Sequence, residues 1–446
     1  MELELRQLAA RLQELDDLLT GCMRCGFCQS VCPLYAQTGL ETDVARGKLA
    51  LIAGLGQRMI EDARGVRRAL ERCLLCGACA AGCPSGARVM DIFILARAVL
   101  AGYLGLSPAK KLLFRQLLAR PRLFDGLLSL APRWQGLITR PAHPELETAR
   151  SRLPALLAER HFSPLAPRPL HRLLERRRPA AAAGSGRARV ALFWGCLVDK
   201  LYPRVGLATL RVLEYHGLEA VLIPGLACCG MPALAAGDSR AFRAMLEHNL
   251  ARLDPTDFDY LATPCATCAS AIKKLWPLMG KNLEQGRRRR LQEIADKSRE
   301  LSRLLVEEDL VESGPGGGGP AVTYHDPCHL EMSLGLRDEP RRLLSAAGPL
   351  VEMARPGGCC GMGGSFSLAH QGLSQKIGRR KLEDILASGC EEVATACPAC
   401  MLQISGLLSR AGGGPRVRHV VEIYARALGG QGRETSPSER RRECLN

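Results

Sequence analysis

Cysteines are the residues of this sequence whose number and spacing can do chemistry. The chain has 20 of them among 446 residues. A run of the form Cys-x-x-Cys-x-x-Cys-x-x-x-Cys-Pro occurs twice near the start, and each cysteine recurs 51 positions later. The two runs contain Cys22, Cys25, Cys28 and Cys32, and then Cys73, Cys76, Cys79 and Cys83. In such runs three cysteines wrap one [4Fe–4S] cluster, and the fourth, before proline, ligates the other cluster.

The spacing therefore predicts two [4Fe–4S] clusters that exchange one ligand between the runs. One ligand set is Cys22, Cys25, Cys28 and Cys83, and the other is Cys73, Cys76, Cys79 and Cys32. Zinc is the alternative, but it requires neither a third cysteine at the same gap nor the Cys-Pro ending. Paired clusters carry single electrons and bind no substrate, so we expect this half of the chain to be a relay.

A second duplication contains five cysteines in each copy, with corresponding positions 131 or 132 residues apart. The copies are Cys196, Cys228, Cys229, Cys265 and Cys268, and then Cys328, Cys359, Cys360, Cys397 and Cys400. Neighbouring side chains on extended backbone point apart, so Gly230 and Gly361 are expected to let the chain turn after each adjacent pair. Five thiolates exceed the needs of one cubane or one zinc ion. Each copy therefore holds either an unusual cluster or a site with a spare ligand, and structural zinc stays open for one copy.

Two different kinds of structure are expected to position these cysteines. Apolar spacing predicts helices over 49–60 and 89–100 in the first part. The later copies alternate short apolar runs with helical patterns. Expected strands are 189–194, 220–224, 260–263, 321–324 and 392–395, and expected helices are 205–216, 240–253 and 340–347. Each cysteine group follows a strand, and open α/β sheets bind ligands at the carboxyl ends of their strands. We therefore expect the five cysteines of a copy to meet at one sheet edge.

Composition and charge limit the setting of this chemistry. No secretory signal and no long uncharged apolar stretch are visible, which indicates a reducing cytoplasm and cysteines that bind metal. The net charge is +16, and residues 110–178 carry 15 Lys and Arg against five acidic residues. This basic segment is a solvated helical surface, a docking site for an acidic flavoprotein or quinone partner, or a peripheral contact with anionic lipid on the inner face of the membrane. Nucleic acid is not expected, because aromatic residues make up 4% and no nucleic-acid motif occurs.

The remaining candidates are weaker. His325 and His329 flank Cys328, and we favour hydrogen-bonded structural roles for both over ligand or proton-donor roles. Cys390 is expected to be a small buried apolar residue, and Cys444 a free thiol without a role. The chain has no dinucleotide fingerprint, P-loop or nucleophile elbow. It is therefore expected to have no flavin of its own, and no residue is assigned a catalytic role.

The two duplications together resemble a known family. The five-cysteine pattern is similar to the CCG domain shared by heterodisulfide reductase, the glycolate oxidase iron–sulfur subunit, the lactate-utilisation iron–sulfur protein and anaerobic glycerol-3-phosphate dehydrogenase. Two ferredoxin motifs before two CCG domains, with the sequence from Tyr324 to His329, resemble the glycolate oxidase iron–sulfur subunit family. The resemblance implies a noncubane [4Fe–4S] cluster on the cysteines of one or both CCG copies.

The resemblance also implies a function. It is that of an electron-transfer subunit of a glycolate or lactate dehydrogenase, which takes electrons from an FAD-containing partner and passes them to quinone or another acceptor. Some relatives lack a cysteine in a closing pair, whereas both copies here keep all five. This difference keeps open a thiol–disulfide reductase of the heterodisulfide reductase type.

The expected fold class is α + α/β, a helical ferredoxin-like domain with two clusters followed by two tandem α/β CCG domains. The expected domains are 1–103 (ferredoxin-like), 104–187 (basic helical connector and linker), 188–312 (first CCG domain), 320–428 (second CCG domain) and 429–446 (disordered tail).

Overall fold

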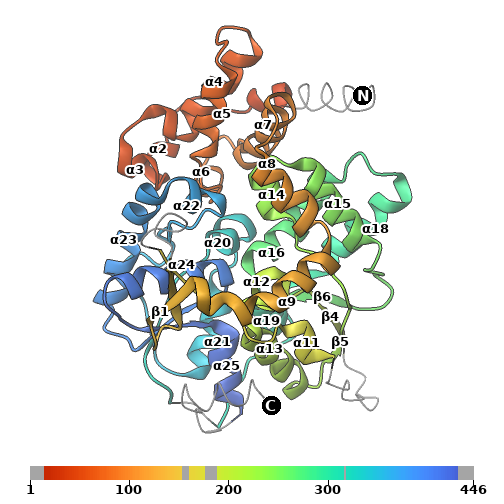
Figure 1. Ribbon diagram of the computed structural model, residues 1–446, viewed down its shortest axis with the longest axis vertical. Coiled ribbons are helices and arrows are strands. Elements are labelled where there is room, and N and C mark those ends of the chain that lie inside the picture. The colour runs from red at the N-terminus through yellow and green to blue at the C-terminus, as the bar shows by residue number, and fades with distance from the viewer. Residues whose placement is uncertain (1–14, 153–159, 176–187, 316–317, 430–446) are drawn as a thin grey trace.

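The computed structural model describes residues 15–152, 160–175, 188–315 and 318–429 (Figure 1). The predicted linker at 178–186 and the predicted tail with Cys444, apart from Gly429, lie outside these residues. A helical N-terminal lobe sits at one end of the molecule, and two α/β lobes lie side by side beneath it (Figure 1). The predicted fold class is confirmed, while the limits of each domain stay a prediction.

Short helices and one long buried helix make up the N-terminal lobe. Its elements are α2 (Cys28–Val31), α3 (Tyr35–Thr38), η1 (Glu41–Asp43), α4 (Ala45–Gly56), α5 (Ala63–Glu71), α6 (Ala78–Ala81) and α7 (Val89–Leu104). Helices α4 and α7 occupy the two predicted helical regions. Ten of the 16 residues of α7 are buried, so this helix is the core on which the cysteine loops rest.

The connector differs in part from its prediction as a helical segment. Its elements are α8 (Pro108–Lys111), η2 (Leu112–Leu118), α9 (Pro121–Ile138), β1 (Thr139–His143), β2 (Thr148–Ser151), β3 (His161–Phe162) and α11 (Leu170–Leu174). The three strands form an antiparallel sheet in the order β1-β2-β3. Pro141 explains the change, because proline cannot continue a helix and is tolerated in an edge strand such as β1.

Each CCG repeat is a four-stranded parallel sheet with helices around it. The first contains β4 (Arg189–Leu192), α12 (Gly195–Lys200), α13 (Pro203–Tyr215), β5 (Glu219–Val221), α14 (Met231–Ala235), α15 (Ser239–Leu250), β6 (Tyr260–Thr263), α16 (Ala266–Ser270), η3 (Ala271–Leu275), α17 (Trp276–Met279), α18 (Gln285–Lys297), β7 (Ser298–Glu300) and α19 (Leu301–Glu307). The second contains β8 (Val322–Tyr324), α20 (Cys328–Leu334), α21 (Asp338–Ala347), β9 (Leu350–Val351), α22 (Ser365–Ala369), α23 (Gln371–Ala387), β10 (Glu392–Thr395), α24 (Pro398–Arg410), β11 (Arg416–His419) and α25 (Val420–Leu428).

The two sheets have the same topology, so the sequence repeat is also a structural repeat. The strand orders are β5-β4-β6-β7 and β9-β8-β10-β11. In each sheet the second strand in the chain (β5 or β9) lies on one side of the first (β4 or β8), and the third strand (β6 or β10) lies on the other side. Ligands bind at such a reversal of strand order, outside the carboxyl ends of the strands. Cys196 and Cys265 follow the adjacent strands β4 and β6, and Cys328 and Cys397 follow β8 and β10.

The three lobes pack directly on one another. Helix α13 contacts α25, α16 contacts α20, and α6 and α7 of the N-terminal lobe contact α20 and α14. One buried apolar cluster continues from the N-terminal lobe into the first repeat, and a second joins the first repeat to the second. Across the described segments, no single helix has both the length and the apolar character needed to cross a membrane. Only α7 taken together with 108–118 meets that test, and this pair is bent by 118°.

Candidate cluster sites

The first N-terminal cysteine group lies at the outer surface of the N-terminal lobe. Cys22, Cys25, Cys28 and Cys83 line one pocket, together with Cys79. Cys25 is exposed. Arg24 and Gly26, on either side of it, both have positive φ, 56° and 84°, so the loop curls around the pocket. The structure thus brings together the four cysteines that the spacing assigned to one cluster.

The second N-terminal group lies deeper, on the side of the CCG repeats. Cys32, Cys73, Cys76 and Cys79 line a neighbouring pocket. Two backbone amides point at its sulfurs, since Tyr35 N lies 3.4 Å from Cys32 Sγ and Leu75 N lies 3.4 Å from Cys73 Sγ. Amide donors of this kind stabilise thiolates, the form in which cysteine binds metal.

Arg97 tests whether this pocket suits an anionic group. Its side chain is buried and donates to the carbonyl oxygens of Leu70, Cys73 and Ala235 at 2.5, 2.7 and 2.6 Å. Within the described chain no carboxylate forms an ion pair with it, although the charge of Glu71 lies close enough to interact. A buried cation without a counter-ion is costly. Four thiolates on a cluster carry net negative charge, so the charge of Arg97 fits a cluster in this pocket.

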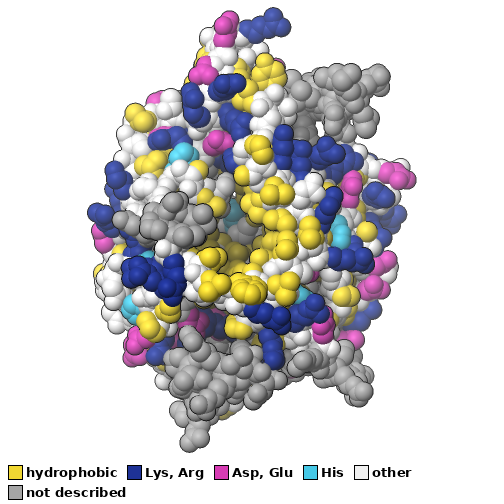
Figure 2. Space-filling view, viewed as in Figure 1, with side chains coloured by type: hydrophobic (Ala, Val, Ile, Leu, Met, Phe, Trp, Pro, Cys, Tyr) yellow, Lys and Arg dark blue, Asp and Glu magenta, His cyan; other side chains and the backbone are white. Residues whose placement is uncertain are grey.

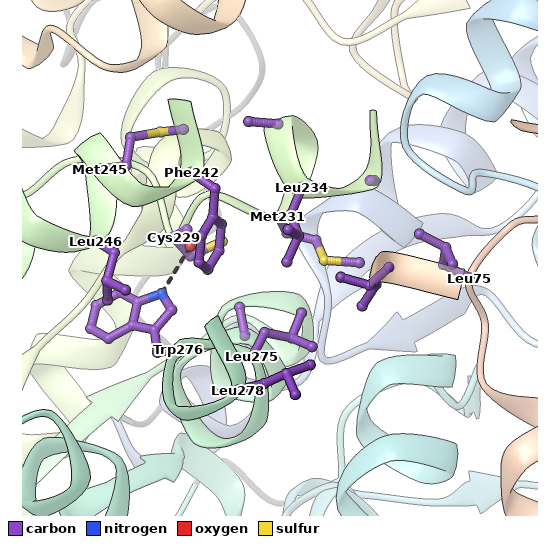
Figure 3. Close-up of a cluster of buried hydrophobic side chains, with 14 of the residues drawn as sticks. Leu75, Cys229, Met231, Leu234, Phe242, Met245, Leu246, Leu275, Trp276 and Leu278 are labelled. Carbon is purple, nitrogen blue, oxygen red and sulfur yellow. Dashed lines mark hydrogen bonds between the residues drawn. The ribbon is translucent and has the colours of Figure 1, made fainter. Parts of the chain in front are cut away.

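The first CCG repeat brings its five cysteines together. Cys196 Sγ lies 3.7 Å from Cys228 Sγ. Cys229 lies within hydrogen-bonding reach of Cys228 and Cys268, and Cys268 within reach of Cys265. The site is backed by apolar side chains, which Figure 3 shows around Cys229. The indole Nε1 of Trp276 donates to the carbonyl oxygen of Cys229 at 2.9 Å and holds the Cys-Cys turn in place (Figure 3).

The second CCG repeat brings its own five cysteines together in the same way. Cys360 Sγ lies 3.7 Å from Cys400 Sγ, and Cys400 interacts with Cys397. Cys328 is close enough to Cys359 and Cys360 for their charges to raise its pKa, after the larger effect of burial. The convergence expected from the strand pattern is therefore present in both repeats.

The glycine after each adjacent pair has the predicted conformation. Gly230 and Gly361 have φ of 89° and 86°, a left-handed region that other residues adopt with strain. A Cβ atom on Gly230 would lie 2.5 Å from the ring of Phe242. On Gly361 it would lie 2.4 Å from the carbonyl oxygen of Ser374. Neither position has space for a larger residue.

The thiols within each CCG group differ in the direction in which their pKa is shifted. Hydrogen bonding from Cys228 and Cys268 lowers the pKa of Cys229, while the pKa of Cys196 is raised by its hydrogen bond with Cys228 and by burial. In the second repeat, burial raises the pKa of Cys359 to about 12, whereas hydrogen bonding with Cys400 lowers that of Cys360. Metal binding displaces protons from such thiols, because only thiolates coordinate.

The two histidines beside Cys328 have different surroundings. His329 is hydrogen-bonded on both ring nitrogens, to Leu75 and Thr267, which agrees with its predicted structural role. His325 is buried within hydrogen-bonding reach of the Cys360 thiol, and neither of its ring nitrogens has a nitrogen or oxygen partner within the described segments. One nitrogen of His325 lies within 4.8 Å of the sulfurs of Cys360 and Cys400. His325 thus interacts with the cysteine group itself, and its imidazole suits a donor set aimed at a metal centre, while its structural role stays a prediction.

Neighbouring cysteine groups also meet. Cys76 of the N-terminal lobe and Cys359 of the second repeat interact electrostatically, and this adds to the effect of burial in raising the pKa of Cys76. Cys265 and Cys397, from different repeats, are within hydrogen-bonding reach of each other. The backbone joins here too, since Ala266 N donates to Ala396 O at 3.0 Å.

Sequence reasoning missed Arg97, Trp276 and Thr267 as parts of these sites. None of them belongs to a cysteine motif, and Arg97 lies in a helix whose apolar pattern predicts only burial. A charged residue inside an otherwise apolar helix was the one available signal. Cys390 is buried and contacts Ser388, in agreement with its predicted role as a small buried residue.

Comparisons with known proteins agree with the arrangement of these sites. Residues 18–87 match the model of the 4Fe-4S dicluster domain, and residues 190–273 and 322–405 each match the model of the cysteine-rich domain CCG. A probable glycolate oxidase iron-sulfur subunit of Bacillus subtilis (strain 168) is 29% identical over 96% of this chain and 98% of its own length. The glycolate oxidase iron-sulfur subunit of Escherichia coli (strain K12) is 27% identical over 95% and 98%. Lactate utilization protein A 2 of Bacillus mycoides (strain KBAB4) is 31% identical over 53% of this chain and 98% of its own length.

These matches confirm the predicted family and the predicted [4Fe–4S] cofactors. The relatives from Bacillus subtilis and Escherichia coli are oxidoreductase subunits, and each matches nearly the whole chain rather than one domain. With one dicluster domain followed by two CCG domains, the chain belongs to the glycolate oxidase iron–sulfur subunit family.

Proposed function

We propose that this protein is the iron–sulfur electron-transfer subunit of a flavin-dependent 2-hydroxy-acid dehydrogenase. An FAD-containing partner oxidises glycolate or lactate to the 2-oxo acid and takes up two electrons. This chain then relays the electrons one at a time to quinone or another acceptor, on the cytoplasmic side of the membrane. The names of the glycolate oxidase and lactate utilization relatives support the substrate class.

One observation carries the proposal: the four cysteine groups form a single unbroken series. Cys79 lines both N-terminal pockets. The second pocket reaches the second CCG group through Cys76 and Cys359, and that group reaches the first CCG group through Cys397 and Cys265. A continuous series from surface to interior suits a relay, whereas four isolated metal sites would suit structural roles.

We assign the ligands of the N-terminal groups as the spacing predicts. Cys22, Cys25, Cys28 and Cys83 hold one [4Fe–4S] cluster, and Cys32, Cys73, Cys76 and Cys79 hold the other. Bound clusters of this type take up and release single electrons. Arg97 and Lys48 lie buried beside the second group and offset its negative charge. The ten CCG cysteines form the ligand sets of the two further sites.

The partner is expected to dock at the exposed first group. Around Cys25 the surface carries large apolar side chains, with Met23 66% and Phe27 56% exposed. Such residues are favourable at the centre of a protein interface. A flavoprotein bound here would bring its flavin close to the pocket of Cys22, Cys25, Cys28 and Cys83.

A thiol–disulfide reductase is the second candidate. The contact between Cys265 and Cys397 favours it, because it joins the two five-cysteine groups at one point where a disulfide substrate could meet both. Each group also has one thiol more than a cubane cluster requires.

Anaerobic purification of the tagged protein from its native host tests the proposal. A flavoprotein that co-purifies in stoichiometric amount and reduces a dye with glycolate or lactate would support it. Iron-loaded protein without flavin that reduces a disulfide would replace it with the second candidate.

Matched cysteine variants locate the electron path. Cys359→Ser should lower the iron content and abolish reduction of the dye by electrons that pass through the CCG repeats. The flavoprotein partner should still bind. Cys390→Ser is the control, since Cys390 is a buried cysteine of the same repeat outside the cysteine groups. Equal losses in both variants would point to folding rather than to electron transfer.

A further inference from the structure

Helix α9 exposes the face that an amphipathic helix normally buries. Leu123, Leu127, Leu130, Trp134 and Leu137 follow one another at intervals of four, three, four and three residues, which places them on one side of the helix. Their side chains are 43%, 49%, 53%, 65% and 70% exposed. The stripe extends over roughly 21 Å, at 1.5 Å per residue. Contiguous apolar patches of this kind mark interaction surfaces.

The orientation of the helix is fixed by its polar side, which faces the protein. The carboxylate of Asp125 accepts from Lys200 Nζ at 2.5 Å. The side chain of Gln135 donates to the carbonyl oxygen of Leu165 and accepts from its amide, each at 3.1 Å. Half-buried polar contacts on the other sides of the helix therefore favour the outward direction of the leucines.

Basic residues surround the stripe. Residues 110–140 contain seven Lys and Arg and one acidic residue, Asp125, which already pairs with Lys200. The exposed basic side chains are Lys111, Arg120, Arg122, Arg133 and Arg140. Leu112 and Leu113 of η2 are 58% and 42% exposed and enlarge the apolar area. Figure 2 shows hydrophobic side chains gathered over the middle of this face, where Figure 1 places α9, with Lys and Arg around them.

We propose that the exposed face of α9 and η2 binds the surface of an anionic lipid bilayer. Apolar side chains and a tryptophan would enter the boundary between headgroups and acyl chains, while the surrounding Lys and Arg contact anionic headgroups. A protein partner is the weaker fit. The exposed side chains of α9 are leucines, isoleucine, tryptophan and arginines. The exposed side chains of α9 therefore include no hydrogen-bond acceptor, and η2 adds only Gln116, whereas protein interfaces pair many donors with acceptors. The inference stands independently of the proposed function, because it concerns lipid binding and not the electron path.

Vesicle sedimentation with the full-length holoprotein tests this. We expect binding to vesicles of phosphatidylglycerol and phosphatidylcholine, weaker binding at high salt, and little binding to phosphatidylcholine alone. Combining Leu127→Gln, Leu130→Gln and Trp134→Gln should weaken binding at least tenfold. Brominated acyl chains should quench Trp134, one of three tryptophans, and leave the buried Trp276 unquenched.

The matched control combines Met59→Gln, Leu40→Gln and Leu386→Gln, which also replaces exposed apolar residues (76%, 53% and 47%) but outside α9 and η2. It should bind vesicles like the wild type, and unchanged iron content in both variants excludes misfolding. Absence of binding to anionic vesicles would overturn the proposal, as would equal losses in the two triple variants. A different result would assign the face to a protein partner instead. In that case the wild type fails to bind vesicles, and the α9 triple variant, but not the control, loses a co-purifying flavoprotein or a dimer.

Discussion

The imidazole Nε2 of His329 lies 3.2 Å from the carbonyl oxygen of Leu75 and donates a hydrogen bond to it. Leu75 stands between two cysteines of the second N-terminal group, and His329 follows Cys328 of the second CCG repeat. The side chain of Leu75 is buried in the apolar cluster that also contains Met231 and Leu278 of the first CCG repeat (Figure 3). One residue thus joins all three lobes, and its φ of 56° equals that of Arg24 at the corresponding position of the first cysteine run, so the two loops curl in the same way.

Replacing His329 should weaken this junction. His329→Phe removes the donor to Leu75 and leaves the half-buried Thr267 hydroxyl without its nitrogen partner, 3.0 Å away. We expect a loss of about 1–3 kcal/mol in the free energy of unfolding. His329→Gln keeps a donor and an acceptor, so it should lose less of the free energy of unfolding than His329→Phe. Anaerobic unfolding of both holoproteins measures this, and equal stability of His329→Phe and the wild type would contradict it.

Arg97→Met should shift the reduction potential of a neighbouring cluster to more negative values. A buried cation near Cys73 favours the reduced, more negatively charged state, and methionine removes that charge at similar volume. Loss of three carbonyl contacts should also cost at least about 2 kcal/mol of stability. Arg64→Met, an exposed change in the same lobe, is the control. Potentiometric titration monitored by electron paramagnetic resonance measures the reduction potential. Equal potentials in Arg97→Met and Arg64→Met would refute the idea.

The two CCG glycines should not tolerate alanine. Left-handed backbone costs an L-residue about 1–2 kcal/mol, and the added Cβ would also collide with Phe242 or with the Ser374 carbonyl. Gly230→Ala and Gly361→Ala should each lower iron content. Gly372→Ala is the matched control, because Gly372 is a helical glycine with no atom near its Cβ position. That change should leave iron content intact and raise stability slightly. Full iron content in Gly230→Ala would show that the turn is dispensable.

Glu300 should make stability depend on pH. Burial raises its pKa to about 7, compared with an ordinary value of 4.5. A raised folded-state pKa contributes stability that is complete below pH 4.5 and is lost as the pH rises through about 7. The loss is about 3 kcal/mol. The free energy of unfolding of Glu300→Gln should therefore rise relative to that of the wild type between pH 5.5 and 8.5. The control is the exposed change Glu219→Gln, whose stability should depend on pH as that of the wild type does. The same pH dependence in Glu300→Gln and the wild type would contradict this account.

Much of this protein was determined by sequence alone, because the decisive features are local. Three cysteines at two-residue gaps can only surround one small centre, and a glycine after Cys-Cys is needed wherever the backbone must turn sharply. Alternating apolar runs and helical patterns likewise specified two repeated α/β lobes. Strand β6 and the strand over 392–395, for example, end just before the cysteines that they position.

Tertiary structure alone decided how these parts face one another. The contact between Leu75 and His329 joins residues 254 positions apart, and the meeting of Cys265 with Cys397 depends on how two sheets pack. Spacing says nothing about either. Sequence left open what surrounds the basic connector, whereas in the structure Asp125 and Gln135 find their partners in the body of the protein, so the leucines of α9 point outward. Local periodicity specifies which side of a helix is apolar, and only packing against distant segments specifies which side is covered.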